Sequence, residues 1–148
     1  QSAQTGAVLL TYLVGKKAFG KSAGIFAAFF VAVNYRHVLG SHFGLPDVHQ
    51  SFFGMLCLLS ALFILDKSSR KTYILAGIVA GLYFSMKYQI FGFLPIATAH
   101  VLLAVKKKSI FYLFNPNIFI AAVVMIVAFV LLNPYYLFST LLIKSLIL

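Results

Sequence analysis

Long apolar runs, divided by short polar segments, dominate this chain. Of its 148 residues, 62% are hydrophobic and 9% are charged, whereas a soluble domain typically carries about 25% charged residues. Too few polar side chains are present to cover the surface of a soluble globule of this size. The runs are continuously apolar and lack the alternation of membrane-barrel strands. We therefore expect an all-α fold, a polytopic bundle of transmembrane helices whose backbone hydrogen bonds are satisfied within each helix.

Six apolar stretches predict about six membrane helices. They cover residues 3–14, 22–38, 48–65, 72–86, 88–105 and 111–132, and an apolar tail follows at 135–148. A helix needs about 20 residues to cross the hydrocarbon core of a bilayer. The third, fifth and sixth stretches come close to this length, whereas the other three would tilt or thin the bilayer locally. We expect the tail to form an interfacial or re-entrant helix.

The cationic residues are unevenly distributed between these stretches. The formal net charge is +10, from twelve Lys and Arg residues against Asp47 and Asp66. Nine of the twelve follow the first, third and fifth stretches: Lys16, Lys17, Lys21, Lys67, Arg70, Lys71, Lys106, Lys107 and Lys108. Because Lys and Arg are enriched in cytoplasmic loops, this alternation predicts that these three segments face the cytoplasm. No base-stacking or groove-reading motif accompanies the charge, so membrane lipids, and not nucleic acid, are the expected partners.

Small and polar residues inside the runs predict helix packing. The G-x-x-x-G spacings at 20–24 and 77–81 place small residues one turn apart, where two helices can approach closely. The single cysteine, Cys57, lies in an apolar run and is expected to be a packing residue. His100 is expected to be an interior residue with its hydrogen bonds satisfied.

Polar residues concentrate in segment 34–50, on the cation-poor side of the predicted membrane. This segment holds three of the four histidines and one of the two acidic residues, and such groups tend to be functional at membrane depth because burying them is costly. Asp47 follows Pro46 and precedes Gln50 by three positions, a spacing typical of a helix start at which the carboxylate accepts backbone N–H bonds. A carboxylate in that position can also face a substrate or a metal.

Four other polar residues on this side are candidates for binding. His42 and His49 could hold a divalent metal together with Asp47, although their spacing matches no established metal motif. Arg36 stands where the second stretch leaves the membrane, and Lys87 ends the fourth stretch as an isolated cation. Each is either an anchor at the lipid headgroups or a ligand for a phosphate.

Three stretches carry a resemblance to a known family. They are residues 7–21 (AVLLTYLVGKKAFGK), 41–47 (SHFGLPD) and 75–88 (LAGIVAGLYFSMKY). In this order and at these distances they resemble the lipid-linked-sugar glycosyltransferases of the GT-C superfamily, in particular the dolichyl-phosphate-mannose protein mannosyltransferase and aminoarabinose transferase group. That family shows a basic (R/K)(R/K)xFG(R/K) loop between two helices, then a Pro-Asp segment, then a glycine-containing stretch that ends in Lys.

The resemblance implies a multi-pass plasma-membrane enzyme with its active site on the extracytoplasmic face. The donor would be a sugar on polyprenyl phosphate, and the acceptor a lipid, a glycan or a protein. Asp47 would lie at the active site, in some members near a divalent metal, and Lys87 would bind the donor phosphate. The family's first-loop acidic motif would lie before Gln1, and its usual Arg before Pro-Asp is replaced, with His42 as the nearest catalytic candidate. We expect residues 1–148 to be part of one transmembrane domain that is truncated at both ends and inactive alone.

Two other function classes stay open at this stage. A transporter or permease would show broken helices and charges near the membrane midplane. In a non-catalytic membrane scaffold, the polar segment would be incidental. The predicted gathering of polar groups at one membrane face favours an enzyme that acts at the membrane surface.

Overall fold

The computed structural model describes residues 2–35, 39 and 46–135, and the regular structure of these residues is entirely helical. The α-helices are α1 (Ser2–Phe19), α2 (Lys21–Val33), α4 (Pro46–Asp66), α5 (Arg70–Lys87), α6 (Leu94–Lys106) and α7 (Pro116–Leu132). Two short 3₁₀ helices, η1 (Ile90–Phe93) and η2 (Ile110–Phe114), precede α6 and α7. The predicted all-α class is confirmed for the described residues.

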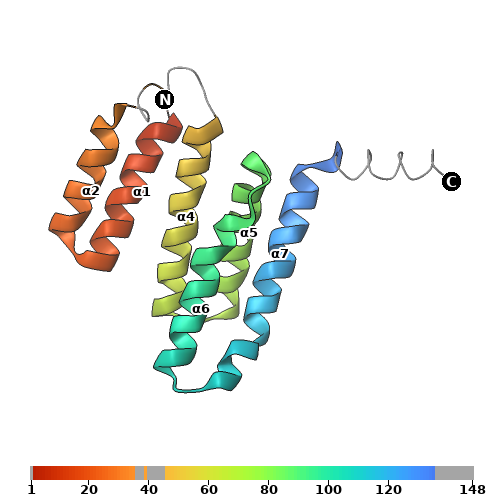
Figure 1. The fold of residues 1–148 in the computed structure, drawn as a ribbon. Helices are drawn as coiled ribbons and strands as arrows, with labels where there is room; N and C mark the ends of the chain where they lie inside the picture. Colours follow the sequence, from red (N-terminus) through yellow and green to blue (C-terminus); the bar gives the residue numbers. More distant parts are fainter. Residues whose placement is uncertain (1, 36–38, 40–45, 136–148) are drawn as a thin grey trace.

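The helices form a bundle in which neighbours along the chain run antiparallel (Figure 1). α1 and α2 make a hairpin at one side, and α4 packs against α1. Both α5 and α6 pack against α4, and α7 packs against α5. Short connections keep sequential helices adjacent in space, as is usual in helical folds.

The cation-rich segments lie at one end of this bundle, where α1, α4 and α6 finish (Figure 1). Lys17 and Asp66 form an ion pair that joins the ends of α1 and α4. A hydrogen bond between Ser68 and Tyr112 then joins the α4–α5 connection to η2. The alternation of loop charge in the sequence therefore corresponds to the two ends of the bundle. That the cation-rich end is cytoplasmic stays a prediction.

The end of the first helix differs from the sequence expectation. α1 continues through most of the segment 15–21 and ends at Phe19, so two of the lysines lie in its last turn. Cations there interact favourably with the helix dipole. The chain then reverses at Gly20, whose φ of 98° is unfavourable for a residue with a Cβ. Gly24, but not Gly20, therefore serves the helix packing predicted for 20–24, because it faces the backbone of α1.

The predicted helices 88–105 and 111–132 do not begin as regular α-helices. η1 and η2 occupy their first turns, and prolines stand at the starts of α6 and α7. Pro95 is the second residue of α6, where a missing backbone N–H costs no hydrogen bond within the helix. Pro116 disfavours helical geometry in Asn115, whose ψ is 129°, so α7 begins at the proline. The side chain of Asn115 also caps α7 by accepting a hydrogen bond from the Asn117 N–H at 3.0 Å.

Two helical stretches among the described residues are long and apolar enough to cross a membrane, His49–Asp66 and Ile110–Leu132. α2 has 13 residues, which rise only about 20 Å, less than a hydrocarbon core of about 30 Å. α5 has 18 residues but carries Arg70, Lys71 and Lys87 at its ends. The prediction of six spans is therefore not confirmed, and two stretches meet both the length and the composition that a span requires.

Small residues bring α5 and α7 into close contact, as the 77–81 spacing predicted. A Cβ added at Gly77 would lie 2.5 Å from the backbone oxygen of Ala121. One added at Gly81 would lie 2.5 Å from the Cβ of Ala128. Neither contact is sterically allowed, so the separation of these two helices depends on glycine at both positions.

Two interior side chains behave as the sequence predicted. Cys57 is fully buried among apolar residues, and His100 is 3% exposed. The Tyr73 hydroxyl lies 2.6 Å from His100 Nδ1, and His100 Nε2 lies 3.3 Å from the Leu113 carbonyl oxygen. Because a carbonyl oxygen only accepts, Nε2 carries the hydrogen and Nδ1 accepts from Tyr73. Both ring nitrogens of His100 are thus satisfied.

Candidate functional site

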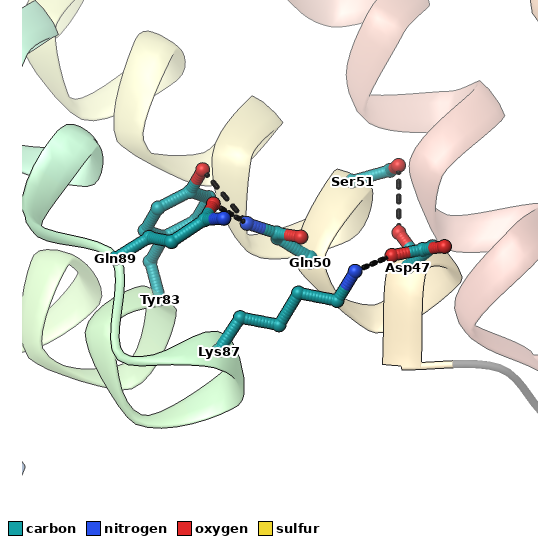
Figure 2. Close-up of polar contacts among 6 residues, drawn as sticks. All are labelled: Asp47, Gln50, Ser51, Tyr83, Lys87 and Gln89. Atoms are coloured by element: carbon teal, nitrogen blue, oxygen red, sulfur yellow. Dashed lines mark hydrogen bonds and ion pairs between the residues drawn. The ribbon is translucent and has the colours of Figure 1, made fainter.

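An ion pair between Lys87 and Asp47 lies where the first turn of α4 meets the last turn of α5 (Figure 2). The two residues are forty positions apart in the sequence, and the antiparallel packing of the two helices brings them together. The Asp47 side chain is 64% exposed and the Lys87 side chain 35% exposed, so both are accessible to a ligand. The other cations of the described residues lie at the opposite end of the bundle.

Asp47 does not occupy the capping position that its sequence context predicted. α4 begins at Pro46, so Asp47 lies inside the first turn of the helix. A carboxylate there still interacts favourably with the positive end of the helix dipole. The Asp47 carboxylate pairs with Lys87, and Gln50 contacts residues of α5 and the following segment. The predicted Asp-x-x-Gln capping pair is therefore not seen among the described contacts.

Gln50 is the centre of a hydrogen-bonded group beside the ion pair (Figure 2). Its Nε2 donates to the Tyr83 hydroxyl at 3.1 Å and to Oε1 of Gln89. The Tyr83 ring lies between two glycines: a Cβ at Gly54 would be 3.4 Å from the ring, and one at Gly92 would be 2.6 Å from it. The ring can occupy this position because residue 92 has no side chain.

A cavity of about 530 Å³ lies between α4, the end of α5, η1 and the start of α6. This volume is within the range of about 300–1,000 Å³ that is usual for small-molecule sites. Its wall is polar near the start of α4, where Asp47, Gln50 and Ser51 lie, and apolar further along: Met55, Leu58, Phe91 and Pro95. Lys87 reaches Asp47 at the polar edge. The cavity can therefore take a ligand with one charged or polar part and one apolar face.

The family comparison decides the class of protein. The family model of dolichyl-phosphate-mannose-protein mannosyltransferases matches residues 3–137 of this chain. The chain belongs to this mannosyltransferase family. Comparisons with curated proteins and with solved structures return no match. Membership indicates a glycosyltransferase embedded in a membrane, in agreement with the resemblance found in the sequence and with the two helical stretches long enough to span one.

Among the site residues predicted for this mannosyltransferase-family chain, the structure brings together Asp47 and Lys87. Arg36 and His42 lie outside the described residues. His49 is exposed on α4, two positions from Asp47, and residues two apart on a helix do not face each other. His49 and Asp47 therefore do not form a pair of ligands for the proposed metal.

The described residues hold no group of three or more His, Cys, Asp or Glu side chains that could bind a metal ion. Asp47, the carboxylate on which a metal site would depend, instead contacts the ammonium group of Lys87. The donors that the described residues supply do not fit a divalent cation, so no step of the proposed reaction is assigned to one.

Three polar residues of the candidate site were not predicted from the sequence: Gln50, Tyr83 and Gln89. Gln50 was assigned to helix capping, and the other two were read as parts of apolar helices. A signal for Gln50 existed, because residues 47, 50, 51, 54 and 58 share one helical face and all line the cavity. No comparable signal existed for Tyr83, whose position depends on the fold of η1.

Proposed function

We propose that this chain is part of an enzyme that transfers a sugar from a polyprenyl-phosphate donor to an acceptor hydroxyl on the extracytoplasmic face of the membrane. Family membership supports the reaction class. The observation that carries the assignment of the site is the pairing of Asp47 and Lys87 at the edge of a cavity. A carboxylate and an ammonium group together supply one group for an acceptor hydroxyl and one for a phosphate.

The proposed reaction is a displacement at the anomeric carbon of the donor sugar. The acceptor oxygen forms a bond to this carbon, and the bond from the carbon to the phosphate oxygen breaks. Polyprenyl phosphate leaves with the bonding electrons, and the acceptor proton passes to a base. The family resemblance assigns the role of base to an acidic residue of the first-loop motif. Asp47 then orients the acceptor.

Lys87 is assigned to the donor phosphate. The donor phosphodiester carries one negative charge, and negative charge grows on its oxygens as polyprenyl phosphate departs. A fixed ammonium group beside those oxygens stabilises the transition state more than the bound donor. The Lys87–Asp47 ion pair does not prevent this, because an exposed pair contributes only about 0–1 kcal/mol. A phosphate can therefore replace Asp47 as the partner of Lys87 at little cost.

The distribution of charge supports an enzyme over a transporter. Coupled transporters place charges and broken helices near the membrane midplane. In the described part of this chain, the Lys, Arg and Asp residues all lie at helix ends or in connections. The candidate site likewise lies at one end of the bundle, at the level where α4 begins and α5 finishes (Figure 1). This position suits a reaction at the membrane surface.

The Asp47→Asn variant tests the proposed function in the full-length protein in membranes. Asparagine preserves the size of the side chain and suits a helix start about as well as aspartate, so the protein should be made in normal amounts. Transfer from a panel of polyprenyl-phosphate sugars should fall strongly, because the charged oxygen that orients the acceptor hydroxyl is lost. Asp66→Asn is the matched control, because it removes the other acidic residue from an equivalent ion pair at the opposite end. Full activity of a well-expressed Asp47→Asn protein would remove Asp47 from the site.

A further inference from the structure

Within the described part of the chain, the amide group of Gln50 is hydrogen-bonded through its nitrogen and not through its oxygen. A glutamine amide has two N–H donors and one oxygen that accepts. Both donors are in use, one to the Tyr83 hydroxyl at 3.1 Å and one to Gln89. Among the described residues, no hydrogen bond to the Gln50 oxygen is present. Since Gln50 lines the cavity, this oxygen, which has no partner within the described residues, can accept a hydrogen bond from a ligand there.

The supports of Gln50 come from a different part of the chain and fix its orientation. Tyr83 is near the end of α5, and Gln89 lies between α5 and η1. Gln89 does not line the cavity, whereas Gln50 and Tyr83 do. Gln89 therefore holds the amide from outside the cavity, and Gly54 and Gly92 leave room for the Tyr83 ring. A side chain held on two sides keeps its free oxygen in one direction, which favours selective binding.

The cavity next to Gln50 suits a sugar ring. Gln50 lies three positions after Asp47 on the same face of α4, and one helical turn rises about 5 Å. This is roughly the distance from a phosphate to the ring of the sugar attached to it, so a donor with its phosphate on Lys87 would bring its ring alongside Gln50. A sugar has hydroxyl groups around its edge and C–H groups on its faces. Phe91 and Pro95 offer the apolar wall that such a face requires.

We propose that Gln50 is a sugar-binding residue whose side-chain oxygen accepts a hydrogen bond from one hydroxyl group of the donor sugar. Tyr83 and Gln89 are positioning residues that hold its amide. This inference rests on the proposed function, because it places the sugar of a polyprenyl-phosphate donor in the cavity. It adds a determinant of which sugar is accepted.

The test compares Gln50→Met with the wild-type full-length protein in membranes. Polyprenyl-phosphate mannose, glucose, galactose and aminoarabinose are first supplied, and the best of them is then supplied as its set of monodeoxy analogues. The wild type should use one analogue less well than the parent donor by roughly tenfold to a hundredfold in kcat/KM, because the Gln50 oxygen then has no donor. Gln50→Met should lose about the same factor with the parent donor and should no longer distinguish that analogue. Discrimination at the other ring positions should persist.

Two further variants separate binding from a structural role. Gln4→Met makes the same change on α1, away from the cavity, and should retain wild-type discrimination. Tyr83→Phe keeps the ring between its glycines but removes the hydroxyl that holds Gln50, so discrimination should fall by several-fold. It also provides the readout if Gln50→Met does not accumulate in the membrane.

The outcomes distinguish this inference from the function on which it rests. Unchanged discrimination at every ring position in Gln50→Met and Tyr83→Phe would overturn the role of Gln50 while leaving glycosyl transfer intact. A wild type that uses every deoxy analogue as well as the parent donor would also overturn the role of Gln50 without affecting glycosyl transfer. A wild type that transfers none of the four sugars would instead reject the proposed donor class, and the sugar-binding role with it.

Discussion

Lys87 offers the sharpest test of the site, because the chain contains a matched ion pair elsewhere. Lys87–Asp47 joins α4 and α5 at one end of the bundle, and Lys17–Asp66 joins α1 and α4 at the other. The exposed fractions of the two lysine side chains are 35% and 29%, and those of the two aspartates are 64% and 58%. The two pairs should therefore make similar contributions to stability, about 0–1 kcal/mol each.

Replacement of each lysine by glutamine separates stability from catalysis. Glutamine keeps a polar side chain but removes the charge. Lys17→Gln should cost as much stability as Lys87→Gln or slightly more, because Lys17 also lies 5.0 Å from the centre of the Phe63 ring. Only Lys87→Gln removes a charge-assisted hydrogen bond to the donor phosphate, which should cost roughly 1.5–3 kcal/mol, or about tenfold to a hundredfold.

The assay measures kcat and KM for the polyprenyl-phosphate donor, together with thermal unfolding, on both variants at equal membrane abundance. Loss of a contact that is equally strong in the bound donor and in the transition state should raise KM. Loss of a contact that strengthens as the phosphate leaves should lower kcat. Lys87→Arg keeps the charge and should recover most of the activity. Donor kinetics of Lys87→Gln that match those of Lys17→Gln would show that Lys87 is a structural anchor only.

Two other predictions test the packing and the orientation of the bundle. Gly81→Ala should lower the free energy of unfolding by about 1–3 kcal/mol, because its Cβ meets backbone and Cβ atoms of α7 that cannot move alone. Gly54→Ala is the control, because its Cβ would lie 3.4 Å from the Tyr83 ring, an ordinary contact distance. Equal stabilities of the two variants would contradict the close packing of α5 and α7. An impermeant thiol reagent applied outside the cell should label Tyr88→Cys and miss Ser109→Cys, while Cys57 is fully buried and should stay silent. The reverse labelling pattern would invert the proposed topology.

The residue types at the site could be predicted from the sequence, but their partners could not. Asp47 and Lys87 stood out because charges are rare in this chain and each lies at the edge of an apolar run. Their pairing depends on the antiparallel packing of α4 and α5, which no local pattern specifies. Gln50 was assigned to capping because a polar side chain near a helix start can serve either the backbone or a neighbouring helix. The neighbour, Tyr83, is visible only in the folded chain.

The fold was predicted most reliably where long apolar runs determine it, and least reliably at the connections. The helical class and the grouping of charged connections at two ends follow from composition and alternation, and the structure agrees with both. The number of spans does not follow, because α2 is too short to cross a membrane, and α5 is long enough but carries charged residues at both ends. Lys16 and Lys17 read as loop residues in the sequence, yet a helix end accommodates cations equally well.

The cavity exists because the connection from α5 to α6 is not a continuous α-helix. Tyr88 ends α5 with a φ of 55°, a left-handed conformation that reverses the chain. η1 then places Gly92 so close to the Tyr83 ring that a Cβ would lie 2.6 Å from it. A continuous helix from residue 88, as the apolar run predicted, would contain neither this reversal nor the 3₁₀ turn that brings Phe91 and Gly92 into the cavity wall. The wall opposite Gln50 therefore arises from an irregular segment, and it is this segment, more than the helices, that we expect to differ between relatives with different sugars.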